Sequence, residues 1–121
     1  HLQKPLLRSE VMATIEDFIA LDIRIGTVME AEELPKARVP AIKMSIDFGE
    51  TLGIKQSSAQ ITKRYTPNEI IGKQVVAVVN FPPRRVAGFK SEVLVIGGVP
   101  IEGDVILLTP DQSVPNGTKI S

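Results

Sequence analysis

The sequence predicts an all-β domain built as a small barrel, on three observations. Short segments in which apolar and polar residues alternate recur along the 121 residues, and this period of two is typical of half-buried strands. Glycine, proline and asparagine residues mark turns between about six such segments. A short capped helix is expected between the third and fourth strands. Five strands with a helix after the third is the order of the OB-fold, a five-stranded Greek-key barrel.

The first expected elements are a short helix and a long strand. Thr14 and Asp17 have the spacing of a capping box, and apolar residues follow at helical spacing, so a short N-terminal helix is expected over residues 15–20. Residues 21–30 alternate strictly and predict the first strand. Gly26 in the middle of that strand indicates a bulge or a tight coil.

The remaining elements follow from alternation and from turn residues. Thr66 and Pro67 begin a second short helix that Gly72 ends, because a hydroxyl cap followed by proline is typical of a first helical turn. Asn116 and Gly117 predict a turn near the C-terminus. Further strands are predicted over residues 41–49, 51–59, 74–80, 91–97 and 104–110.

Two prolines and two arginines form a rigid, charged elbow between two of these strands, at residues 82–85. Proline lacks the N–H that a central strand needs. The planar guanidinium fork of arginine suits a phosphate and a carboxylate equally. Arg84 and Arg85 could therefore clamp phosphates, pair with acids such as Glu92 or Asp104, or contact a bound polypeptide.

Residues that carry catalysis or hold metals are scarce. His1 is the only histidine and there is no cysteine, so a Ser–His–Asp triad is impossible from Met12 onward and metal ligands would have to be carboxylates alone. No apolar run approaches the roughly 20 residues of a membrane span. We therefore expect a binding protein with no catalytic residue, no metal and no cofactor.

The charges are arranged unevenly along a chain whose 14 basic and 14 acidic residues cancel. Residues 36–90 hold ten basic and three acidic residues, a net charge of +7, whereas both ends of the chain are acidic. Such asymmetry indicates a surface that faces a polyanion. The residues predicted to bind RNA are Lys36, Arg38, Lys55, Ser57, Ser58, Lys63, Arg64, Asn80, Arg84, Arg85 and Lys90.

The few aromatic residues bear on the choice of ligand. Phe18 and Phe48 fall on core-facing positions, whereas Phe81 and Phe89 flank the elbow. Proteins that bind single strands usually stack several bases on aromatic rings, so shape-and-phosphate binding of a folded RNA fits this chain better. Together with Val86, the two flanking rings also predict an apolar groove for polypeptide.

Three strings carry a resemblance to a known family: "RIGTV…AEELPKAR", "YTPNEIIGKQVVAVVNFPPRRVAGFKSE" and "VPNGTKI". They resemble the tRNA-binding OB-fold domain found in some methionyl-tRNA synthetases, in the phenylalanyl-tRNA synthetase β-chain and in the endothelial monocyte-activating polypeptide. The similarity covers residues 18–121 and is strongest to stand-alone bacterial members described as export-related chaperones. Departures fall at residues 37–40 and 82–85, where synthetase domains usually have Ala-Asp-Lys-Leu and Lys-Pro-Arg-Lys.

The resemblance implies a homodimeric cytoplasmic chaperone that binds unfolded or precursor polypeptides, with tRNA binding as the alternative. The short apolar helix and the apolar C-terminal run place a dimer interface at Ile15, Phe18, Ile19, Ile101 and Val105. Residues 12–121 are expected to form the domain, and residues 1–11 a disordered leader or expression remnant.

Overall fold

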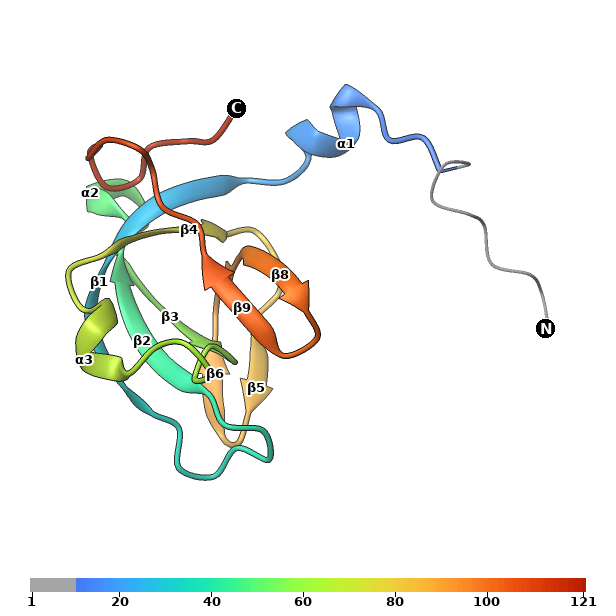
Figure 1. Ribbon diagram of the computed structural model, residues 1–121. Helices are drawn as coiled ribbons and strands as arrows, with labels where there is room; N and C mark the ends of the chain where they lie inside the picture. The colour runs from blue at the N-terminus through green and yellow to red at the C-terminus, as the bar shows by residue number, and fades with distance from the viewer. Residues whose placement is uncertain (1–10) are drawn as a thin grey trace.

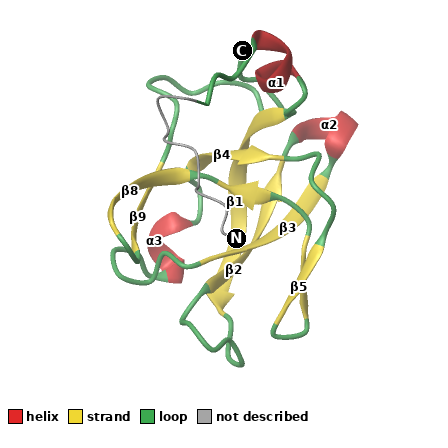
Figure 2. Ribbon diagram, turned by 90° about the vertical axis from the view of Figure 1, so that its right-hand side faces the viewer, coloured by secondary structure: helices red, strands yellow, loops and turns green. Residues whose placement is uncertain are grey.

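The computed structural model describes residues 11–121, and its centre is a five-stranded antiparallel sheet that curls into a nearly closed barrel (Figure 1). The strand order is β3-β2-β1-β4-β7, and two separate hairpins, β5-β6 and β8-β9, complete the fold (Figure 2). The sheet strands are β1 (Ile23–Glu33), β2 (Ile42–Asp47), β3 (Ile54–Ala59), β4 (Gln74–Val78) and β7 (Leu94–Val95). The predicted all-β barrel of OB type is therefore confirmed.

Strand β1 is long and coiled, and it pairs with β4 along its first half and with β2 along its second half. Gly26 lies where β1 passes between these partners. A Cβ atom there would sit 2.6 Å from Ile46 Cγ2 and 2.7 Å from Phe48 Cδ1, so only glycine lets the strand bend this tightly against the core. Gly26 is therefore a point of close approach between β1 and the core. The register shift itself falls between Val28 and Glu30.

The core fills the inside of this barrel. Alternate residues of β2 are fully buried, and Phe48, at 1% exposure, is the largest side chain in the main cluster. The C-terminal tail closes one end, because Gly117 and Ile120 donate backbone hydrogen bonds to Ile25 and Ile23 of β1. The Asn116–Gly117 turn predicted from the sequence begins this pairing.

The helices are single short turns. The predicted capping boxes are present at α1 (Ile15–Ile19) and at α3 (Pro67–Ile70), which lies between β3 and β4 as expected. A third turn, α2 (Gly49–Leu52), was not predicted. Helix α1 buries none of its residues among those described, and Phe18 is 38% exposed. The expectation that Phe18 is a core residue is therefore wrong for the isolated chain.

The elbow is a hairpin, not a loop between two long strands. Arg84 and Arg85 belong to β5 (Arg84–Val86), which pairs with β6 (Phe89–Ser91) through a two-residue turn. Both turn residues, Ala87 and Gly88, have positive φ, as the tight turns that match strand twist require. The single strand predicted over residues 91–97 is accordingly divided between β6, β7 and the start of β8 (Gly97–Ile101), which pairs with β9 (Asp104–Leu107).

The barrel closes along a seam between β3 and residues 91–93, where side chains replace part of the usual backbone ladder. The Glu92 N–H donates to Gln56 O at 2.8 Å, and the Gln56 N–H donates back to the Glu92 carboxylate at 2.9 Å. The Ser58 N–H donates to Ser91 Oγ at 3.2 Å. The seam thus covers the first part of the β3 edge and ends at Ser58.

Candidate functional site

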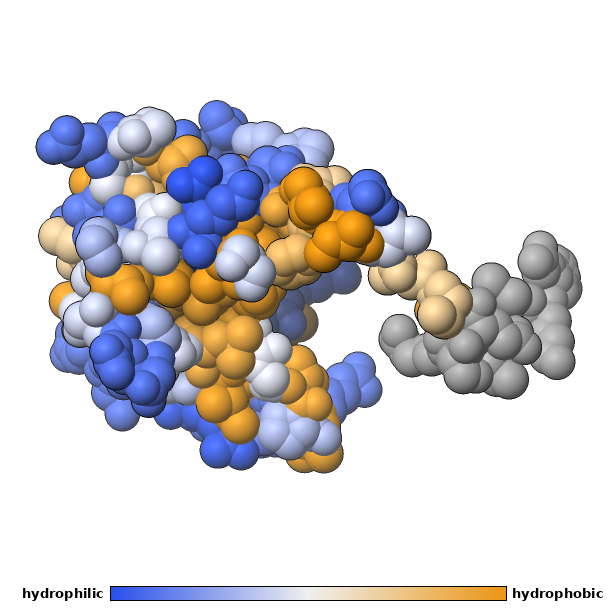
Figure 3. All heavy atoms as spheres, turned by 90° about the horizontal axis from the view of Figure 1, so that it is seen from above, coloured by the Kyte–Doolittle hydropathy of each residue, from blue (hydrophilic) through white to orange (hydrophobic). Residues whose placement is uncertain are grey.

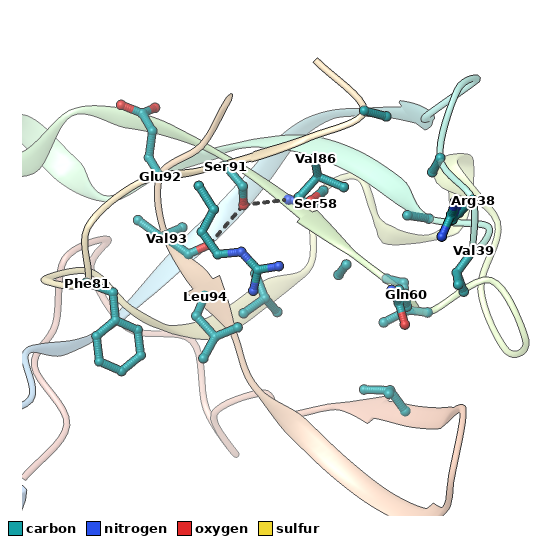
Figure 4. A pocket seen from close by; sticks show the side chains of 18 of the residues that line it. Arg38, Val39, Ser58, Gln60, Phe81, Val86, Ser91, Glu92, Val93 and Leu94 are labelled. Carbon is teal, nitrogen blue, oxygen red and sulfur yellow. Dashed lines mark hydrogen bonds between the residues drawn. The ribbon is translucent and has the colours of Figure 1, made fainter. Parts of the chain in front are cut away.

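A groove of about 720 Å³ opens beside the end of this seam. This volume lies in the range typical of ligand sites. Four parts of the chain form it: the loop between β1 and β2, the end of β3, the segment from Phe81 through β7, and β9 (Figure 4). The groove therefore joins segments that are far apart in the sequence, and the barrel positions all of them.

The floor of the groove is apolar, and several of its apolar walls face solvent. Ile61 and Val93 form buried parts of the floor, whereas Val39, Phe81 and Leu94 are 52%, 43% and 46% exposed. Exposed apolar side chains that gather around a hollow mark an interaction site. The predicted polypeptide groove near Phe81 and Val86 therefore coincides with a cavity of this structure.

The rim of the groove is basic. Lys36, Arg38 and Arg84 line it, and no described residue forms a salt bridge with any of them. The one acidic residue in the lining is Glu92, whose carboxylate already accepts the hydrogen bond from Gln56 in the seam. A ligand in the groove therefore lies in a positive electrostatic field that nearby acidic side chains do little to neutralise.

The hairpin separates the two arginines of the elbow onto opposite faces. Because side chains alternate along a strand, Arg84 and its cross-strand partner Ser91 face the groove, and both line it. Arg85 and its partner Lys90 lie on the other face, and neither lines the groove. Neither arginine pairs with Glu92 or Asp104 in the described chain.

Three residues predicted to bind RNA, namely Ser57, Asn80 and Arg64, form hydrogen bonds within the protein instead. Ser57 is completely buried and donates its hydroxyl to Val93 O at 2.8 Å, so its prediction as a ligand contact is wrong. Asn80 uses both ends of its amide, accepting from the Asp22 N–H and donating to Ala20 O. Its amide therefore fastens the segment before β1 to the end of β4.

Arg64 forms a two-point ion pair with Asp104, at 2.5 Å from Nε and 2.8 Å from the second terminal nitrogen. Asp104 is buried, with 5% of the residue exposed. The hydrogen bond and charge of Asp104 raise the pKa of Arg64, and the hydrogen bond from Arg64 lowers the pKa of Asp104 below its usual range. This pair connects the segment before α3 to β9, so Arg64 has a structural role in place of the predicted phosphate contact.

The other predicted residues are distributed over the surface. Ser58 lines the groove, whereas Lys55 and the exposed Lys63 do not. Phe89 is half-buried in a smaller hollow, where the ammonium of Lys43 lies 5.7 Å from the centre of its ring. The prediction that Phe89 lines the polypeptide groove is therefore wrong.

Sequence reasoning missed several groove residues, chiefly Val39, Leu94 and Leu107. The exposure of Val39 and Leu94 depends on where the strands end, and alternation in the sequence marked both as ordinary strand or loop residues. The sequence signal that could have identified Val39 is its position: it follows the basic residues Lys36 and Arg38, precedes Pro40, and lies in a segment that departs from the family pattern.

Among residues 11–121, no group of three or more histidine, aspartate or glutamate side chains is placed to hold a metal ion. The helices of the described chain are also too short and too polar for any of them to span a membrane.

Comparisons with known proteins bear on this site. Among solved structures, the chaperone CsaA from Bacillus anthracis str. Ames superposes with a TM-score of 0.87 at 71% identity, over 92% of this chain and 100% of that chain. The CsaA chaperone protein from Picrophilus torridus superposes with a TM-score of 0.84 at 48% identity, over 91% of this chain and 100% of that chain.

Methionine–tRNA ligases are among the similar curated proteins. The ligase of Porphyromonas gingivalis is 38% identical over 105 residues, which is 87% of this chain but 15% of that enzyme. For the ligase of Methanothrix thermoacetophila the values are 37% over 114 residues, 94% of this chain and 16% of the enzyme. The chain thus spans less than a fifth of the length of these relatives. The family model described as "Putative tRNA binding domain" matches residues 23–119, and the chain belongs to this tRNA-binding domain family.

Proposed function

We propose that the protein is a molecular chaperone that binds unfolded or precursor polypeptides in the groove. The observation that carries this proposal is the cluster of half-exposed apolar side chains, Val39, Phe81 and Leu94, around an apolar floor. Isolated domains rarely keep such side chains together on their surface unless a partner covers them. The similarity to two proteins named as CsaA chaperones supports the same function.

The test compares Leu94→Ala with Ile71→Ala. The two side chains are equally exposed, at 46% and 45%, but only Leu94 lines the groove. Each truncation should cost no more than about 1.5 kcal/mol of stability, because half of each side chain is already in water. Leu94→Ala should weaken binding of a fluorescein-labelled unfolded precursor, measured by anisotropy, and Ile71→Ala should not. Equal affinities of both variants and the wild type would refute polypeptide binding in this groove.

We also propose that the protein works as a homodimer in the cytoplasm, on precursors before their export. Support comes from α1, where Ile15 and Ile19 are 64% and 63% exposed, and from Ile101, which is 61% exposed on β8. Figure 3 shows hydrophobic side chains gathered around α1 and in a band over the same face. Val105 fits this role less well, because it is partly buried against the core and lines the groove.

A stable dimer would bury more than about 1,000 Å² in total. Sedimentation at micromolar concentration should give twice the monomer mass, and Ile15→Glu together with Ile19→Glu should give the monomer. A wild-type particle of monomer mass would contradict the dimer.

A second candidate function is tRNA binding. The family match supports it, and so does one feature of the hairpin: Arg85 and Lys90 lie directly opposite each other with no described acidic partner. Two like charges held side by side repel each other unless an anion lies between them. A phosphate of a folded RNA would supply that anion.

A further inference from the structure

We infer that the groove takes its polypeptide as an added β-strand, paired through main-chain hydrogen bonds with the free end of β3 at Ser58 and Gln60. This inference rests on the polypeptide-binding function proposed above and specifies how the ligand is held. Three features carry it: the direction of the backbone groups on β3, the point at which the seam ends, and the chemistry of the groove wall.

Strand β3 is an edge of the five-stranded sheet, paired on one side with β2. Backbone polar groups of successive residues in a strand point alternately to its two sides. Gln56 donates its N–H to the Glu92 carboxylate and accepts the Glu92 N–H at its carbonyl, and Ser58 donates its N–H to the Ser91 hydroxyl. The even-numbered residues of β3 therefore direct their backbone groups away from β2 and toward the seam.

The same alternation directs the carbonyl of Ser58 to this side and, continued one residue past the end of β3 at Ala59, the N–H of Gln60 as well. Within residues 11–121, no backbone partner outside the regular strand pairs and no side chain bonds to either group. Both residues line the groove, and Figure 4 shows Ser58 at the seam with Gln60 farther along, toward Arg38 and Val39. A donor and an acceptor at an open sheet edge are a template for one more strand.

The seam shows that this edge already accepts substitutes for a strand. The Glu92 carboxylate and the Ser91 hydroxyl occupy the first edge positions of β3, where a neighbouring strand would offer carbonyl groups. The pairing stops at Ser58 because the partner segment, which runs antiparallel to β3, leaves it there through β6 into the hairpin with β5. A ligand strand would continue the row from the point at which the protein's own groups end.

The groove wall indicates which segment fits. A strand along this edge would place alternate side chains over the apolar floor formed by residues such as Ile61 and Val95. Lys36, Arg38 and Arg84 at the rim complement acidic rather than basic neighbours of that apolar stretch. The occupant we propose is an extended segment of alternating apolar residues flanked by a carboxylate. Main-chain recognition tolerates many sequences, which suits a protein with varied clients.

The decisive experiment uses a short fluorescein-labelled peptide in which valine and threonine alternate between terminal glutamates. Two modified versions carry N-methyl groups on the odd or on the even residues. An added strand directs only one of these two sets of N–H groups at β3, so one version should bind about 3- to 10-fold more weakly for each hydrogen bond lost. The other version should bind like the unmodified peptide.

The matched protein variants are Gln60→Pro and Gln60→Ala. Proline removes the N–H but disturbs no bond to β2, since the pairing of β3 with β2 ends at Ala59. Alanine removes the side chain and keeps the N–H. Gln60→Pro should bind the peptide about 3- to 10-fold more weakly than Gln60→Ala, because the two variants share the loss of the side chain and only proline lacks the N–H. If Gln60→Pro melts early, the two methylated peptides decide the question alone.

The outcomes separate this inference from the function on which it rests. If the peptide binds and the two methylated versions bind equally, edge pairing is wrong while polypeptide binding stands. If neither the peptide nor an unfolded precursor binds, the proposed function fails and the inference fails with it. If Gln60→Pro reduces tRNA binding but not peptide binding, the edge serves RNA and the inference is overturned.

Discussion

The hairpin register allows a sharp test of tRNA binding, by replacing Arg85 and Lys90 together with alanine. The two cations lie directly across from each other on the face that turns away from the groove. Each phosphate contact that is lost should reduce the slope of log affinity against log salt concentration by roughly 0.7–0.9. If both residues contact phosphate, the double variant should lose about 1.5 from that slope.

The assay is a filter-binding or anisotropy titration with unmodified tRNA at several salt concentrations, repeated with two different tRNAs. Both should weaken equally, because phosphate contacts position a ligand and carry no sequence information. The melting temperature should stay the same or rise, since the substitution removes a repulsive cross-strand pair. The control is Arg84→Ala, which removes a cation from the opposite face. An unchanged slope in the double variant, or an equal loss in the control, would refute this assignment.

Three further predictions concern the fold that supports both faces. Gly26→Ala should lower the free energy of unfolding in urea by about 3 kcal/mol, because the added Cβ meets core atoms. Gly98→Ala, whose Cβ would have no atom within 4 Å, should change this free energy little. Equal effects of the two substitutions would contradict the close packing at Gly26. Asp104→Asn should lower the melting temperature at pH 7, and the difference in melting temperature from the wild type should close below about pH 4. Folding lowers the pKa of Asp104, so its contribution to stability is present above the unfolded pKa and is lost as the pH falls through the folded pKa. A difference that persists at low pH would exclude the ion pair with Arg64 as its source. Ala87→Asn should stabilise the hairpin by about 1 kcal/mol, because Ala87 has a φ of 51°, and any destabilisation would contradict that reasoning.

Local patterns predicted most of the fold. The alternation in β2 is strict, and its inward residues are all buried. The capping boxes at Thr14 and Thr66 need only the residues from the cap to three positions on, and both are formed. Signals of this kind depend on neighbours within one turn or one strand, so they can be read without knowing the rest of the structure.

The misses fall where the deciding contact is distant in the sequence or the element is very short. The Arg64–Asp104 pair joins residues 40 positions apart, and nothing in either local sequence indicates it. Ser57 lies in the polar run Gln56–Ser58, where alternation cannot tell the inward side from the outward one. Strand β5 has three residues, which is too short for a period of two to be recognised beside two prolines.

This shortest strand also decides how the candidate site is divided. Because side chains alternate, Arg84 and Val86 share the face that lines the groove, and Arg85 lies on the opposite face with Lys90. Adjacent arginines in the sequence therefore belong to different surfaces, one beside apolar walls and one directly opposite another cation. An apolar polypeptide and a phosphate backbone bind to different kinds of surface. The polypeptide needs apolar area that excludes water, and the phosphates need cations without acidic partners. The hairpin supplies both without requiring either ligand to enter the other's surface, so a substitution on one face should report on one ligand.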